Sequence, residues 1–112
     1  MKTTLRLVFV LVLAAMLFVT VRASLSEGVF AAGGRLWADG WFRATLADAY
    51  FGFLAVFVWI GWRERTLVAR VVWFVLLMTL GNIAIAFYFL LALQRLDGPG
   101  IDGLFARKAE PA

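Results

Sequence analysis

The sequence predicts an all-α membrane protein: three transmembrane helices in a small bundle with short interfacial segments. Of its 112 residues 64% are hydrophobic and 16% charged, against roughly half and a quarter in globular proteins. Three apolar runs, at residues 5–22, 44–62 and 70–94, are close to or above the roughly 20 residues that cross a bilayer. We therefore expect residues 1–112 to form a single membrane domain without a separate soluble core.

The first run is open to two interpretations. Basic residues precede it, and Ala23 offers a small residue at a cleavage position, as in a signal peptide. Its apolar stretch is long for a signal peptide, however, and its Leu, Val and Phe residues favour insertion by roughly 5 kcal/mol. We expect a retained helix, with cleavage of residues 1–23 as the alternative.

The connection over residues 23–43 combines a capping pattern with interfacial aromatics. Ser24 and Glu27 form a capping box that predicts a short surface helix ending at Gly33 and Gly34. Tryptophans beside arginines are typical of the headgroup level of a bilayer. The expected interfacial aromatics are Trp37, Trp41, Trp62 and Trp73. The alternative is that the tryptophans of this connection line the mouth of a ligand or partner site.

The second run carries a carboxylate roughly one turn inside its start. An aspartate costs about 2.5 to 3.5 kcal/mol at a bilayer centre and less near an end. Asp48, Gly52 and Ala55 follow one another at i, i+4 and i+7, which places the carboxylate on a small-residue stripe. Small residues let another helix approach closely, so we expect Asp48 to face protein.

The third run has polar residues in its interior. Measured as one helix rising from the arginine-rich turn, it places Asn82 roughly 17 Å and Tyr88 roughly 26 Å above that turn, with Asp48 at roughly 21 Å on its own helix. We therefore expect an intramembrane polar cluster of Asp48, Asn82, Tyr88 and Thr79. Gly81 joins Gly52 and Ala55 as an expected helix-packing residue.

Charge distribution predicts the orientation. Arg63, Arg65 and Arg70 lie in the short turn of residues 63–70, which favours the cytoplasm and makes these residues topology anchors. Three spans then place the C-terminus outside. The tail of residues 95–112 contains a break at 97–100 and is expected to be flexible, or else to form one short interfacial turn.

The missing residue types exclude several kinds of chemistry. The chain contains neither cysteine nor histidine, so disulfides, thiolate nucleophiles and sites built on those ligands are not available to it. No complete catalytic set, metal site or cofactor site is predicted. The basic residues are spread along the chain, so we expect lipid-headgroup contacts and no nucleic-acid binding.

The chain resembles a known family of small bacterial membrane proteins. The similarity is strongest in DAYFGFLAVFVWIGWRE, RVVWFVLLMTLGN and WADGWFRATL. The residues that carry it are Trp41, Asp48, Tyr50, Gly52, Trp59, Glu64, Trp73, Gly81 and Asn82. The family is a domain of unknown function numbered 1475. The resemblance implies a three-helix protein of the bacterial inner membrane and implies no activity. It covers the chain from the first apolar run to about Leu93, and the tail beyond Arg95 lies outside it.

Three functional hypotheses follow from these features. The first is an accessory or interaction subunit that packs against other membrane helices, either a second copy of itself or a larger complex. The second is a small proton-coupled transporter that uses Asp48 as its membrane carboxylate. The third is a protein or enzyme that binds a lipid, isoprenoid or pigment, with Asp48 as an acid beside Tyr50 and Tyr88.

Overall fold

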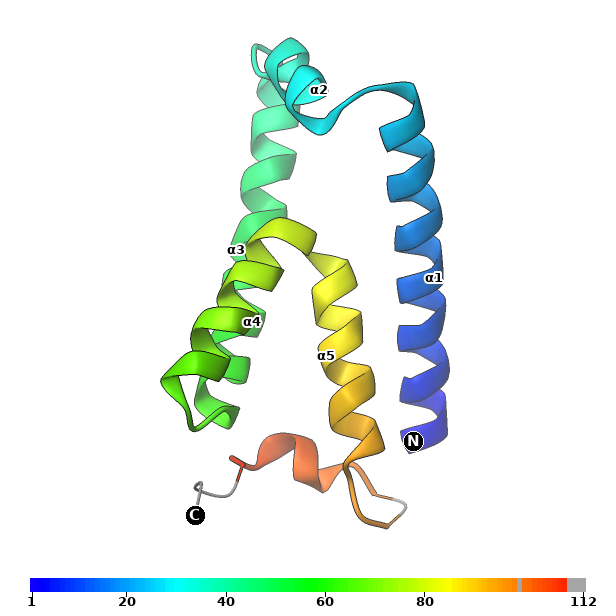
Figure 1. Ribbon diagram of the computed structural model, residues 1–112, viewed down its shortest axis with the longest axis vertical. Helices are drawn as coiled ribbons and strands as arrows, with labels where there is room; N and C mark the ends of the chain where they lie inside the picture. The colour runs from blue at the N-terminus through cyan, green and yellow to red at the C-terminus, as the bar shows by residue number, and fades with distance from the viewer. Residues whose placement is uncertain (99, 109–112) are drawn as a thin grey trace.

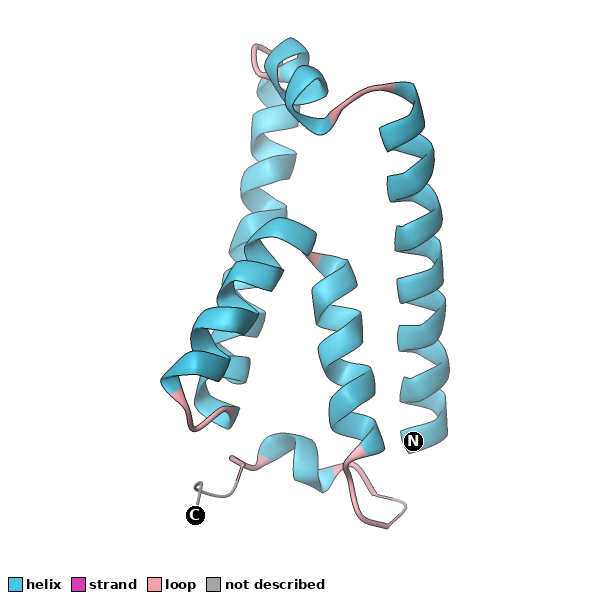
Figure 2. Cartoon of the chain, viewed as in Figure 1, coloured by secondary structure: helices cyan, strands magenta, loops and turns pink. Residues whose placement is uncertain are grey.

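The computed structural model describes residues 1–98 and 100–108, and in that part of the chain it contains only helices and loops (Figure 2). In chain order the elements are α1 (Lys2–Ser26), α2 (Val29–Leu36), α3 (Gly40–Arg63), α4 (Leu67–Leu80), α5 (Asn82–Gln94) and the short 3-10 helix η1 (Asp102–Phe105). The predicted all-α class is confirmed. The number of long helices is not.

Two helices, α1 and α3, are long and apolar enough to cross a membrane. They have 25 and 24 residues, which corresponds to about 36 to 38 Å of helix. They correspond to the first two predicted helices, extended by a few residues at each end. At the start of α3, the Asp39 carboxylate accepts hydrogen bonds from the N–H groups of Trp41 and Phe42 at 2.8 and 3.1 Å.

The prediction of one long third helix over residues 70–94 is wrong. The helix is interrupted at Gly81, where the chain reverses its direction, so that α4 and α5 form a helical hairpin. These helices have 14 and 13 residues, about 20 Å each, which is too short to cross a bilayer alone. Figure 1 shows the hairpin rising beside the lower half of α3 and returning along α1.

The break depends on a backbone conformation that favours glycine. Gly81 has φ +56° and ψ −123°, and a Cβ atom there would lie 2.6 Å from Cζ of Phe53. The Tyr50 hydroxyl donates a hydrogen bond of 2.9 Å to the carbonyl of Met78, which the end of α4 leaves without a helical partner. Two aromatic side chains of α3 therefore hold the tip of the hairpin.

The short helix expected in the first connection is present, but its position differs. Ser24 to Ser26 continue α1, so the expected capping box is not used. α2 begins at Val29 and runs through Gly33 and Gly34, since neither glycine adopts a positive φ. Arg35 Nη2 donates a 2.7 Å hydrogen bond to Glu27 Oε1, and this bond lowers the pKa of the Glu27 carboxyl.

The core lies in the half of the molecule that contains the hairpin. α5 is its centre, since it contacts α1, α3 and α4. The buried apolar residues are Ile60, Leu77, Ala84, Ala86, Tyr88, Ala92, Leu93 and Leu104. α1 contributes no fully buried residue, but Phe9 stacks on Phe89 with ring centroids 4.2 Å apart.

The described part of the tail is folded against the bundle, where we expected a flexible end. Residues 101–108 cross below the hairpin and return to the end of α3 (Figure 1). Lys2 Nζ donates to the carbonyls of Leu96 and Gly98 at 2.9 and 3.0 Å. Residue 99 and residues 109–112 lie outside the described part of the chain. The N-terminus, the turn after α3 and the described part of the tail thus share one end of the molecule, whereas three spans would place the turn and the tail at opposite ends.

Candidate functional site

A polar cluster forms at the end where α3, α5 and the tail meet. Arg63 ends α3 and is buried, with 6% of its surface exposed. Its Nη1 donates to the Tyr88 hydroxyl at 3.0 Å, and its Nε donates to the Ala106 carbonyl at 3.2 Å. The guanidinium also lies 5.4 Å from the ring centroid of Trp59. Within the described part of the chain, these contacts satisfy a buried cation by hydrogen bonds and aromatic faces, without a carboxylate.

The neighbouring carboxylate has its own partner. Glu64 is 3% exposed, and its Oε1 lies 2.6 Å from Nζ of Lys108. Lys108 also donates its backbone N–H to the Arg63 carbonyl at 2.9 Å. The tail therefore supplies the charge that a buried Glu64 requires.

The same cluster completes the C-terminal end of α3. A helix leaves its last four carbonyls without ordinary partners, and here all four accept hydrogen bonds. The donors are the Glu64 N–H to Ile60, Arg70 Nε to Gly61, Arg107 Nε to Trp62 and the Lys108 N–H to Arg63, at 2.7 to 2.9 Å. Cations at a helix C-terminus also complement its dipole.

The arginines predicted as topology anchors thus have structural partners. Arg63 and Arg70 make the bonds just described, and Arg65 Nε donates to the Lys108 carbonyl at 2.9 Å. A role in orientation is compatible with these bonds, because all three side chains stay at the same end of the molecule.

The predicted intramembrane cluster is not assembled. Asp48 and Asn82 are exposed, and Thr79 donates to the Val75 carbonyl of its own helix at 2.8 Å. Tyr88 is buried beside Arg63. Asp48 precedes Arg63 by 15 residues, about 22 Å along α3. Among the described residues no hydrogen bond joins these four side chains, because the reversal at Gly81 carries Tyr88 back toward the turn.

Some of the expected packing and interfacial residues contact the rest of the bundle, and others are exposed. Gly81 contacts Phe53, but Gly52 and Ala55 are exposed, with nothing within 4 Å of the position of a Gly52 Cβ. Trp37 and Trp41 are exposed near α2, and Trp62 is partly exposed at the opposite end. Trp73 is half-buried, with its ring 4.8 Å from that of Tyr88 in an edge-to-face contact.

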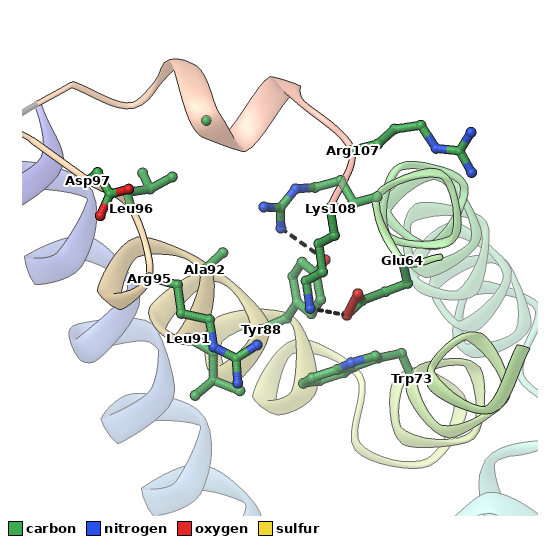
Figure 3. Close-up of a pocket in the computed structure, with 12 residues that line it drawn as sticks. Glu64, Trp73, Tyr88, Leu91, Ala92, Arg95, Leu96, Asp97, Arg107 and Lys108 are labelled. Atoms are coloured by element: carbon green, nitrogen blue, oxygen red, sulfur yellow. Dashed lines mark hydrogen bonds and ion pairs between the residues drawn. The ribbon is translucent and has the colours of Figure 1, made fainter. Parts of the chain in front are cut away.

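A pocket of about 730 Å³ opens beside the polar cluster (Figure 3). Its wall comes from the end of α3, Trp73 of α4, the last turns of α5 and the tail. The lining combines charged side chains, including Arg63, Glu64, Arg95 and Lys108, with apolar ones, including Trp73 and Leu91. A volume of this size lies within the usual range for small-ligand sites.

Sequence reasoning missed this site, since it treated Arg63 to Arg70 and the tail separately. Two signals were present. Gly81 followed by Asn82 is a pair that commonly interrupts a helix, and Leu104 to Lys108 places apolar residues directly before two cations. The turn after α3 and the tail can contact each other only because the helix is interrupted at Gly81. An uninterrupted third helix would place them on opposite sides of the bilayer.

The described residues contain no group of three or more acidic side chains that could hold a metal ion. Comparison with curated proteins and with solved structures found no match. The family model of a protein of unknown function, DUF1475, matches residues 2–102, so it covers the first helix and extends past the Arg95 boundary of the expected resemblance. The chain therefore belongs to the DUF1475 family.

Proposed function

We propose that this chain is an integral protein of a bacterial inner membrane that acts as an interaction subunit by packing against a transmembrane helix of another chain. The apolar composition and the two long helices support the membrane location. The observation that carries the interaction role is the face of α3 that the half-height hairpin leaves uncovered.

This face is the stripe of Asp48, Gly52, Ala55 and Trp59, which follow at helical spacing on α3. At its lower end, Trp59 packs on α5, with its ring centroid 4.9 Å from that of Phe89. Above Trp59 the other three residues are exposed. The stripe therefore continues an existing helix–helix contact beyond the hairpin tip, where α5 begins, and its small residues fit a second helix.

Asp48 is a second reason to expect a partner helix. It lies nine residues inside α3, and within the described chain it makes neither a hydrogen bond nor an ion pair. A charged group exposed to lipid is costly, whereas a donor on a neighbouring helix satisfies it. A partner helix with a small residue and a hydrogen-bond donor at this level completes the stripe.

Retention of α1 is part of the proposal. The stacking of Phe9 on Phe89 and the bonds from Lys2 to the end of α5 support it, because cleavage at Ala23 removes both. The intact mass of the purified protein tests this point. A mass that lacks residues 1–23 rejects it.

The experiment for the interaction role is native mass spectrometry of the tagged chain, extracted from its own membrane in a mild detergent. We expect a stoichiometric assembly with a second copy or another membrane protein. Gly52→Ile fills the open position and abolishes the assembly without disturbing the chain's own packing. Leu54→Phe adds bulk at an exposed position on another face of α3 and leaves the assembly intact. A wild-type monomer, or a Gly52→Ile assembly like the wild type, rejects the role.

Proton-coupled transport is the second candidate, and the observation that favours it is that Asp48 has no partner among the described residues. The variant Asp48→Asn retains the size and hydrogen bonding of the side chain but cannot carry a proton. Loss of proton-coupled flux in vesicles, with the assembly unchanged, supports transport. Equal flux in wild type and variant rejects it. The third hypothesis, an Asp48–Tyr88 acid pocket, has no support in the geometry, since the two residues lie far apart.

A further inference from the structure

The pocket beside Arg63 contains a cation without a counter-ion. In the described part of the chain, the Arg95 side chain makes no hydrogen bond and no ion pair, and Figure 3 shows it pointing into the pocket. A guanidinium presents N–H donors in a planar fork that matches two oxygens of a phosphate or carboxylate. Arg95 is therefore available to a ligand.

The other charged groups of the pocket are largely engaged. Glu64 is paired with Lys108 at 2.6 Å, and Arg63 donates to Tyr88. The Arg107 side chain points away and donates to the Trp62 carbonyl. Asp97 lies at the far end of the pocket from Glu64 and Lys108 in Figure 3. Cations outnumber carboxylates in the lining, so the pocket favours an anion.

The opposite part of the lining is apolar. Leu91 and Ala92 lie one turn before Arg95 on α5, and the Trp73 indole faces them across the pocket (Figure 3). Trp73 is held in place by its edge-to-face contact with Tyr88. A ligand bound to Arg95 therefore also meets hydrocarbon, which a free inorganic anion cannot use.

With the membrane location proposed above, the pocket lies at the level where a lipid places its headgroup. It sits at the level of the end of α3, the last turn of α5 and the tail, which is the end of the apolar span. Its volume of about 730 Å³ accommodates a headgroup and the first part of an acyl chain but not a whole lipid.

We propose that this pocket binds a phospholipid with an anionic phosphate headgroup, with the phosphate on Arg95 beside Lys108 and the chain against Trp73 and Leu91. The proposal rests on the membrane location proposed above but not on the interaction role of α3, since the exposed part of the stripe, Asp48 to Ala55, lies toward the other end of the molecule.

The test titrates delipidated protein with phosphatidic acid, phosphatidylcholine or inorganic phosphate and measures the bound species by native mass spectrometry. We expect phosphatidic acid to bind at least ten-fold more tightly than phosphatidylcholine. Arg95→Gln weakens phosphatidic acid binding about ten-fold and brings it close to phosphatidylcholine. Arg43→Gln, which removes an exposed cation at the opposite end of the molecule, retains the wild-type preference.

Three outcomes overturn the proposal. The first is equal binding of the two lipids by the wild type. The second is an Arg95→Gln variant that binds phosphatidic acid like the wild type. The third is inorganic phosphate that binds alone as tightly as phosphatidic acid and displaces it, which identifies a free anion as the ligand. Since the Arg95 side chain makes no bond within the described structure, its variant is expected to unfold at the wild-type temperature, and this measurement separates lost binding from misfolding.

Discussion

The two tyrosines of the chain hold different parts of the fold, and their hydroxyl groups differ in importance. Tyr88 accepts a hydrogen bond from the buried guanidinium of Arg63, whereas Tyr50 donates to a backbone carbonyl from a partly exposed position. Hydrogen bonds to charged groups contribute roughly 1.5 to 3 kcal/mol, and neutral ones roughly 0.5 to 1.5 kcal/mol. The hydrogen bond to Tyr88 therefore contributes more to the stability of the fold than the one made by Tyr50.

We predict that Tyr88→Phe lowers the free energy of unfolding by about 1.5 to 3 kcal/mol, because the change leaves a buried cation short of one acceptor. Tyr50→Phe, the matched control, lowers it by no more than about 1.5 kcal/mol. Denaturant unfolding of both variants in the same detergent gives the comparison. A larger loss for Tyr50→Phe contradicts this view of the polar cluster.

At the scale of the elements, the reversal at Gly81 decides the architecture. A residue with a Cβ is strained by about 1 to 3 kcal/mol in such a conformation, and here its Cβ also meets the ring of Phe53 at 2.6 Å. The hairpin therefore depends on this glycine in two independent ways.

We predict that Gly81→Ala lowers the free energy of unfolding by more than the backbone strain alone, which is about 1 to 3 kcal/mol, because the clash with Phe53 adds to it. Gly34→Ala is the control, because Gly34 lies inside α2 with nothing within 4 Å of an added Cβ, and alanine is favoured in helices by about 1 kcal/mol. Thermal unfolding followed by circular dichroism measures both. An unchanged Gly81→Ala protein shows that the chain does not reverse at this residue.

The sequence predicts α1 and α3 well because hydrophobic length alone defines them. It does not reveal the hairpin, since residues 70–94 are apolar on both sides of Gly81 and hydropathy cannot distinguish one long helix from two short ones. The reversal is fixed by Phe53 and Tyr50, which belong to another helix. The Arg63–Tyr88 contact and the docked tail depend on that reversal. The Gly81–Asn82 pair indicates only that a helix can be interrupted there, and not how its two halves pack.

At the scale of the whole molecule, the reversal redistributes charge. Eight of the eleven basic residues lie at the end that holds the N-terminus, the turn after α3 and the tail. They are Lys2, Arg6, Arg63, Arg65, Arg70, Arg95, Arg107 and Lys108. The predicted three-span arrangement divides these basic residues between the two faces of the membrane, which reduces the charge difference that indicates the orientation. The two long helices and the hairpin gather them at one end of the molecule. With the membrane location proposed above, the positive-inside rule predicts that this end faces the cytoplasm.

The most direct measurement is the side from which the turn and the tail can be labelled. The chain has no cysteine, so single cysteines can be introduced at the exposed positions Leu67, Phe105 and Phe30 and treated with a membrane-impermeant maleimide. Labelling of intact cells and of inside-out vesicles distinguishes the two faces. The fold predicts that Leu67→Cys and Phe105→Cys react only from the cytoplasmic face and Phe30→Cys only from the other. Labelling of Phe105→Cys from the same face as Phe30→Cys contradicts the hairpin and restores a third membrane crossing.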